Sequence, residues 1–130
     1  FRGDVVNAAG LCSFGYNAGD PSKYIAGVMS AVTGWERSME ELLKIGERIA
    51  NMRQAFNSRE GINPVQLYVN PRIIGTPPQT EGPLKGVTAD IETQVRDNLK
   101  ALDWDLSTAK PSKQKLLELG LDDVAKALHP

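Results

Sequence analysis

The middle of the chain constrains the fold most strongly, because it is too rich in proline and glycine to form a regular element. Between Gly61 and Gly86 the sequence has five prolines and four glycines, the two end residues included. Proline lacks a backbone donor, and glycine adds entropy to the unfolded chain. We therefore expect residues 61–87 to form an extended segment that is held by the surface it lies against, with Ile73 and Ile74 packed.

A first helix is predicted over residues 21–33, within a helical part that spans residues 20–60. The Asp20 carboxylate can accept hydrogen bonds from free backbone N–H groups, and Pro21 gives up a donor that would have no partner. Gly34 supplies the left-handed stop. Apolar residues at steps of three and four predict one buried stripe, formed by Tyr24, Ile25, Val28, Met29 and Val32.

A second helix is predicted over residues 39–57. Ser38 and Glu41 have the spacing of a capping box. Gly46 interrupts the apolar face, and because glycine inside a helix costs about 1 kcal/mol relative to alanine, we expect another backbone to pack closely against it. The face itself consists of Leu42, Ile45, Ile49, Met52 and Phe56. The polar residues Glu47, Arg48, Asn57, Arg59 and Glu60 are interpreted as a solvated face with capping contacts.

The C-terminal helices are predicted within residues 88–130. A third helix begins at residues 88–90 and runs to Leu102, with Trp104 folding back onto it. Two shorter helices follow, the first between Pro111-Ser112 and Gly120 and the second capped by Asp122. No window shows sustained alternation with a period of two. We therefore predict an all-α fold, a multihelical domain with a long Pro/Gly-rich irregular segment between the second and third helices.

The composition fits a single globular domain over residues 1–130. Of these residues 41% are apolar and 24% charged, and the formal charge is −1 at pH 7. Neither sign is gathered in a block, and no apolar run reaches the roughly 18 residues of a membrane helix, so we expect neither a nucleic-acid nor a membrane partner. Residues 1–4 are no signal peptide and do not begin with Met, so the chain is interpreted as a piece of a longer protein. Its cysteine usage predicts a reducing, cytoplasmic location.

Cys12, the only cysteine, closes the stretch NAAGLC at residues 7–12. Such a cysteine often acts as a small buried hydrophobe. A catalytic thiol needs a base, but the only histidine is His129, next to the chain end, and an iron–sulfur cluster needs about four thiolates. Residues 8–10 leave backbone N–H groups uncovered by side chains, which suits either a flat ligand or close helix packing. The aromatic residues Phe14, Tyr16 and Tyr24 are interpreted as core.

Several stretches, taken together, resemble the C-terminal part of the aldehyde:ferredoxin oxidoreductase family. They are NAAGLC at residues 7–12, GERIANM at 46–52, FNSREG at 56–61, EGPLKG at 81–86 and KLLELGL at 115–121. The resemblance covers nearly the whole chain, in order and at similar spacing. It implies a tungsten or molybdenum bis-pterin cofactor beside a [4Fe-4S] cluster in the full-length protein, with neither bound tightly by the fragment alone.

In that family a D-x-x-G-L-C motif contacts a pterin and supplies the fourth cluster thiolate, while an upstream C-x-x-C-x-x-x-C run supplies the other three. The resemblance implies that residues 1–19 form a cofactor-site loop, in which Cys12 is this fourth ligand and Gly10 and Leu11 form the backbone that meets the pterin. Asn7 stands where the family has Asp, so we expect a weaker or differently oriented contact. Residues 97–104 also lack the usual tyrosine pair and Arg-Gly, which marks a divergent member. No catalytic residue is assigned.

The activity implied by the resemblance is oxidation of an aldehyde to a carboxylic acid, with electrons passing through the cluster to ferredoxin. The expected partners are the missing N-terminal part of the same chain, ferredoxin and a small aldehyde, with self-association left open. The isolated fragment is expected to be inactive. If Gly61–Gly86 and the stretch 7–12 normally lie against the missing part, the fragment should expose a large apolar surface.

Two other functions stay open at this point. Relatives of the family include a subunit that reduces an aromatic acyl-CoA, and the divergent Asn7 and third-helix region are compatible with that reaction. The second is a non-enzymatic helical interaction module that has lost its cofactors.

Overall fold

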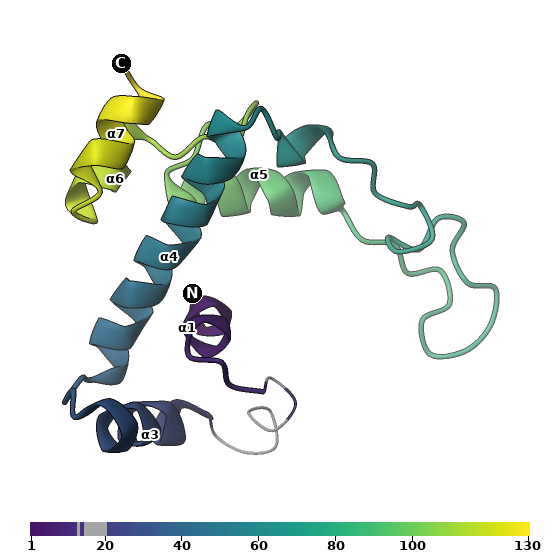
Figure 1. Ribbon diagram of the computed structural model, residues 1–130. Coiled ribbons are helices and arrows are strands. Elements are labelled where there is room, and N and C mark those ends of the chain that lie inside the picture. The colour runs from purple at the N-terminus through teal and green to yellow at the C-terminus, as the bar shows by residue number, and fades with distance from the viewer. Residues whose placement is uncertain (13, 15–20) are drawn as a thin grey trace.

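The computed structural model describes residues 1–12, 14 and 21–130 (Figure 1). Its elements in chain order are α1 (Arg2–Ala8), α3 (Pro21–Thr33), α4 (Met39–Arg59), the 3₁₀ helix η1 (Pro64–Gln66), α5 (Ile91–Leu102), α6 (Lys113–Glu118) and α7 (Asp122–Leu128). Over these described ranges there is no β-strand, only two isolated bridges. The all-α prediction is thus confirmed, but the predicted loop over residues 1–19 is wrong for Arg2–Ala8, which form helix α1. None of the described helices is long and apolar enough to cross a bilayer.

Helix α4 is the axis on which the other helices are arranged. It begins in the predicted capping box, in which the Glu41 N–H donates to Ser38 Oγ at 3.2 Å and the Ser38 N–H donates to Glu41 Oε2 at 2.8 Å. Figure 1 shows α3 at its N-terminal end, α1 beside its first half, and α6 and α7 beside its second half. The predicted helix over residues 39–57 is confirmed and extends two residues further.

Among the described helices, α1, α4, α5 and α6 all end in a Schellman motif. In this motif a residue just past the helix has left-handed backbone angles. Its N–H and the N–H of the following residue both donate to carbonyls of the last helical turn. The left-handed residues are Gly10, Gly61, Asp103 and Gly120, with φ of 68°, 77°, 57° and 64°. Helix α3 ends at Gly34 with φ 72°, as predicted.

The left-handed residue of α5 is an aspartate, and its side chain links this helix to the next. The Ser112 hydroxyl donates to the Asp103 carboxylate and accepts from the Lys115 N–H at 3.0 Å, which makes Ser112 the N-cap of α6. The backbone N–H of Ser112 donates to the Asp103 carbonyl at 3.0 Å. Asp122, by contrast, is the first residue of α7 rather than its cap, because Leu121 takes the N-cap position.

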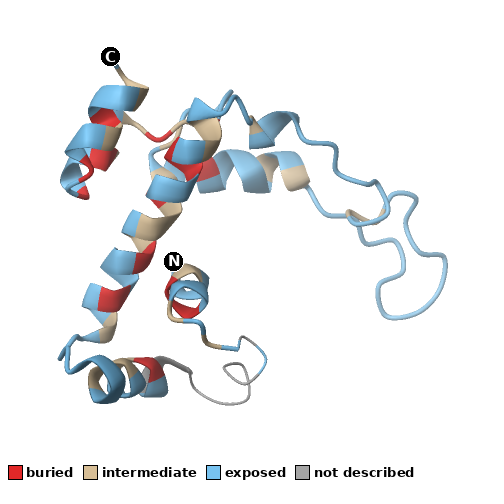
Figure 2. Cartoon of the chain, in the orientation of Figure 1, coloured by how far each residue is buried: buried red, intermediate tan, exposed pale blue. Residues whose placement is uncertain are grey.

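Two separate clusters of buried apolar residues form the core of the described chain. The first joins α1, α3 and α4 through Val5, Val6, Ile25 and Leu42, and the second joins α6 and α7 through Leu116, Leu119, Leu121 and Ala125. Figure 2 shows buried residues along α4 where these helices meet it.

The predicted apolar faces of α3 and α4 are covered only in part. On α3, Ile25 is buried, and Met29 packs against the same cluster, but Tyr24, Val28 and Val32 are exposed. On α4, Leu42 is buried, whereas Phe56 is 54% exposed, and Ile45 and Met52 are also exposed. The prediction of one buried stripe on the helix over residues 21–33 is therefore wrong within this chain, and the apolar face of α4 is likewise partly exposed. Periodicity identifies the apolar face of a helix, but it does not show that the same chain covers that face.

Residues 61–90 form an arm that reaches away from the helices (Figure 1). At its base the Asn63 side chain donates to the Ser107 carbonyl at 2.9 Å, and further along the Ala89 N–H donates to the Ile74 carbonyl at 2.9 Å. Ile74 is half-buried, but Ile73 is 79% exposed, contrary to expectation. Leu67, Tyr68, Val69, Leu84 and Val87 are also exposed.

Candidate cofactor-binding site

The candidate site lies where α1 ends, and the stretch NAAGLC forms that end. The Leu11 N–H donates to the Val6 carbonyl at 3.0 Å, and the Gly10 N–H donates to the Asn7 carbonyl at 3.2 Å. Gly10 has φ 68°, and a Cβ placed on it would have no neighbour within 4 Å. Leu11 turns inward and packs against the first core cluster. The residues after Asn7 are thus a helix terminator whose apolar residue anchors the turn.

This arrangement corrects one detail of the sequence interpretation. The N–H groups of Ala9, Gly10 and Leu11 are not left open for a ligand, because each bonds to a carbonyl within α1. The small side chains do leave the surface open at Gly10. A ligand there would therefore meet open space, carbonyl oxygens and the side chains of Asn7 and Cys12, both of which are exposed.

The neighbouring sequence predictions have mixed outcomes. Phe14 and Tyr24 are exposed, so the interpretation of these two aromatics as core is wrong within this chain. Tyr16 and the predicted cap Asp20 lie outside the described residues.

Helix α1 packs against α4 at Gly46. A Cβ on Gly46 would collide with the Phe1 carbonyl oxygen and would lie 2.9 Å from Val5 Cγ2. The predicted close backbone approach is thus confirmed, and Phe1 provides it. Val5 and Val6 are buried in the same contact, and Arg53 Nη1 pairs with Asp4 Oδ1 at 3.2 Å along its edge. Helix α1 therefore lies directly on α4.

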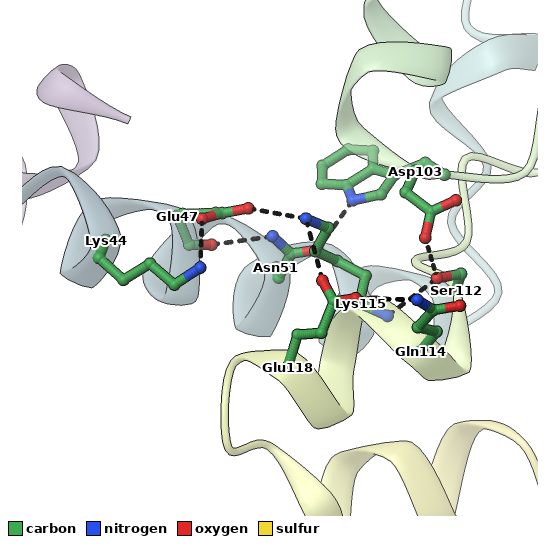
Figure 3. A network of polar contacts seen from close by, with 9 residues as sticks. Lys44, Glu47, Asn51, Asp103, Ser112, Gln114, Lys115 and Glu118 are labelled. Atoms are coloured by element: carbon green, nitrogen blue, oxygen red, sulfur yellow. Dashed lines mark hydrogen bonds and ion pairs between the residues drawn. The ribbon is translucent and has the colours of Figure 1, made fainter.

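Helix α4 is held to the C-terminal helices by a polar network (Figure 3). Lys115 Nζ donates to Glu47 Oε1 at 3.1 Å, and Lys44 Nζ lies 3.4 Å from Glu47 Oε2. Burial alone would raise the pKa of Glu47, but the hydrogen bond from Lys115 and the charges of Lys115 and Lys44 lower it below its ordinary value. The same hydrogen bond raises the pKa of Lys115, against the effect of burial. The sequence interpretation placed Glu47 on a solvated face, and this is wrong, because its side chain is only 16% exposed.

Asn51 is the polar centre of this contact and is fully buried, with 0% of its surface exposed. Its Nδ2 donates to the Glu47 carbonyl at 2.9 Å, and its Oδ1 accepts from Trp104 Nε1 at 2.8 Å. The Trp104 backbone N–H bonds to the Leu99 carbonyl of α5, while its indole, which was expected to fold back onto that helix, reaches Asn51 of α4. Sequence reasoning missed the roles of Asn51 and Glu47, because their partners are 53 and 68 residues away.

The other titratable groups do not make this region a metal site by itself. No group of three or more His, Cys, Asp or Glu side chains suited to a metal ion occurs in the part of the chain that the structure describes. His129 Nε2 lies 2.9 Å from the Pro111 carbonyl and fastens the C-terminus to the loop before α6. The end of α1 brings one exposed thiol, that of Cys12, whereas an iron–sulfur cluster needs about four.

The sequence of this chain matches a family of redox enzymes. The family model "Aldehyde ferredoxin oxidoreductase, domains 2 & 3" matches residues 2–121. The chain is 34% identical over 122 residues to a tungsten-containing aldehyde ferredoxin oxidoreductase of Pyrococcus abyssi, and this match covers 92% of the chain but 19% of the relative. The enzyme of the same name from Pyrococcus furiosus is 34% identical over 120 residues, which cover 90% of the chain and 19% of that relative. The chain thus spans about a fifth of the length of these relatives.

Proposed function

Because this chain belongs to the aldehyde ferredoxin oxidoreductase family, we propose that it is the C-terminal part of an enzyme that oxidises aldehydes to carboxylic acids with ferredoxin as electron acceptor. Family membership supports the oxidoreductase role. The share of the relatives that the chain covers supports the idea that most of the enzyme is a further stretch of polypeptide. We further propose that the reaction runs from aldehyde to acid and that ferredoxin is the electron acceptor.

The observation that carries the proposal is the placement of Cys12. An iron–sulfur cluster is held by about four cysteine thiolates, of which this chain has one. Cys12 follows directly on Leu11, which is anchored in the core, and it is exposed to whatever lies opposite. We assign it as the fourth ligand of a [4Fe-4S] cluster whose other three thiolates come from the rest of the enzyme.

Asn7, Gly10 and Leu11 are assigned to the pterin side of the same site. The absent Cβ of Gly10 leaves room for a flat ring, and Leu11 fixes the turn from below. Since the N–H groups of Ala9, Gly10 and Leu11 are already bonded, the Asn7 amide and the carbonyl oxygens of the turn are the groups that would form hydrogen bonds to a pterin. That amide offers one neutral acceptor where a carboxylate would offer two charged ones, which predicts a weaker contact.

In the assembled enzyme the tungsten or molybdenum pterin supplies the two-electron oxidation and the cluster passes single electrons onward. This chain's residues bind and orient these groups. Cys12 would hold one iron of the cluster, while α1 and the turn at Gly10 and Leu11 fix where the thiol stands.

The exposed apolar side chains of α3, α4 and the arm support the expected intramolecular partner. Tyr24, Val32, Leu67, Tyr68 and Ile73 are all more exposed than core residues, and the arm carries few charges to keep it solvated. We propose that the remainder of the enzyme covers these residues. The chain by itself is then expected to bind neither cofactor tightly and to have no activity.

Removal of the thiol tests the proposal. In the intact protein that contains this chain, Cys12→Ala should abolish the cluster, measured as iron content and as the loss of its electron paramagnetic resonance signal after reduction. The matched control is Ala101→Ser, an exposed change in α5 outside the stretch NAAGLC. Unchanged iron in Cys12→Ala would refute the ligand assignment.

Because Asn7 departs from the family pattern, the second reaction, reduction of an aromatic acyl-CoA, is tested as well. Anaerobic assays with aldehydes and a viologen dye, beside assays with an acyl-CoA and a low-potential donor, separate the two reactions. Protein that contains no tungsten, molybdenum or iron after anaerobic production would favour the interaction module instead.

A further inference from the structure

The contact between α1 and α4 leaves no room for a side chain at position 46. A Cβ there would collide with the Phe1 carbonyl oxygen and would approach both the Phe1 carbonyl carbon and Val5 Cγ2 to 2.9 Å. Two of these three neighbours are backbone atoms, which cannot move away by a change of rotamer. Any side chain at this position must therefore shift one helix relative to the other.

The helix that shifts is α1. Helix α4 has 21 residues, a capping box at its start, and fixed contacts to Lys115 of α6 and to Trp104. Helix α1 has seven residues and no side-chain cap at its N-terminus. The ion pair between Arg53 and Asp4, which joins it to α4, is partly exposed and can lengthen with little loss.

A shift of α1 reaches Cys12 because the connection is short and rigid. Two backbone hydrogen bonds close the turn at Gly10 and Leu11, and the half-buried Leu11 side chain packs against the core cluster that Val5 and Val6 share with α3 and α4. Cys12 comes next in the chain. A displacement of Val5 is therefore carried to the thiol rather than absorbed on the way.

We propose that Gly46 is a positioning residue for Cys12: its missing side chain sets how deeply α1 lies on α4, and thereby where the thiol stands. The ligand role of Cys12 rests on the proposed function, whereas the mechanical link rests on the contacts above. Not every helical glycine has this role. A Cβ on Gly27, inside α3, would have no neighbour within 4 Å.

The experiment compares Gly46→Ala with Gly27→Ala in the 130-residue chain without metal. Backbone hydrogen exchange is followed by NMR, and alkylation by iodoacetamide reports on Cys12, the only thiol in the chain. Gly46→Ala should speed exchange at the amides of Val5, Ala9 and Leu11 about tenfold or more and change the alkylation rate about threefold or more. Gly27→Ala should leave both unchanged. No change in Gly46→Ala would overturn the proposal.

Two further measurements separate positioning from general loss of structure. The amides of Leu116 and Leu121 in the second cluster should keep their protection in Gly46→Ala, and an equal loss there would show that Gly46 supports the whole fold and overturn the positioning role. Gly46→Val places a larger side chain against the same Phe1 carbonyl oxygen and should change the alkylation rate more than Gly46→Ala does, and an equal or smaller change would contradict the steric link. Because no cluster is needed, the result is independent of the iron content of Cys12→Ala.

Discussion

Helices α1 and α6 are both terminated by the pair Gly-Leu, with the same two backbone hydrogen bonds. The end of α6 is closed, that is, covered by the rest of the chain, whereas the end of α1 is open to the surroundings. After Leu121 the chain enters α7 at once, and Leu121 is only 3% exposed. After Leu11 comes the exposed Cys12. A Cβ on Gly120 would meet the Arg48 guanidinium at 3.4 Å, whereas a Cβ on Gly10 would meet nothing within 4 Å. The comparison teaches that the local signal ends a helix in both places, and that the surroundings decide whether the end is available to a ligand.

The largest effect is expected when the leucine of each cap is removed. Leu121→Ala should lower the free energy of unfolding by about 2–4 kcal/mol, because it leaves a cavity in the second cluster. Leu11→Ala should cost less, since Leu11 is only half-buried. Urea denaturation followed by circular dichroism measures both, with Leu117→Ala, 47% exposed, as the control. Equal losses for Leu11 and Leu121 would mean that the open end is as well covered as the closed one.

Adding a methyl group to each glycine should sharpen the comparison from the other side. Gly10→Ala and Gly120→Ala both force a side chain into the left-handed region, so each should lose about 1–2 kcal/mol in the free energy of unfolding. The guanidinium of Arg48 can swing away, so the closed end should cost little more than the open one. Gly3→Ala in α1 has space for the new atom and should cost nothing. A much larger loss for Gly120→Ala would show that Arg48 is fixed.

The smallest effect is expected from pH, through the ion pair that fastens α4 to the closed end. The lowered pKa of Glu47 means that its contribution is present above the ordinary value of 4.5 and is lost as pH falls through the folded value. The raised pKa of Lys115 means that its contribution is present below 10.5 and is lost as pH rises through its folded value. Glu47→Gln should therefore destabilise at neutral pH by up to about 1 kcal/mol and by progressively less toward pH 3.

The control for the pH series is Glu60→Gln, since Glu60 pairs with Arg59 in an exposed position. It should leave the free energy of unfolding unchanged over the same range. A pH dependence that survives Glu47→Gln would assign the effect to another carboxylate.

Features encoded by neighbouring residues could be predicted from the sequence. The capping box of Ser38 and Glu41 and the stop at Gly34 depend on spacings of a few residues, and both are confirmed. The close approach at Gly46 was predictable because glycine is costly inside a helix, although the partner, Phe1, was not. Whether the apolar faces of α3 and α4 are buried could not be predicted, because burial depends on surfaces far away in sequence.

The candidate site divides in the same way. The turn at Gly10 and Leu11 is a local signal, but the sequence interpretation treated its N–H groups as open where the Schellman motif uses them. The contacts that fix α4 behind it, from Trp104 to Asn51 and from Lys115 to Glu47, join residues with no local pattern in common. The ligand role of Cys12 came from the family resemblance and stays a prediction.

One hydroxyl group links the end of α5 to the start of α6. Ser112 Oγ donates to the Asp103 carboxylate at the end of α5 and accepts from the Lys115 N–H at the start of α6 (Figure 3). Fraying of either helix end breaks a bond on which the other depends, so the two ends are expected to open together rather than one after the other. That shared opening also breaks the contact from Lys115 to Glu47. The stability of the C-terminal helices is therefore expected to affect the stability of α4.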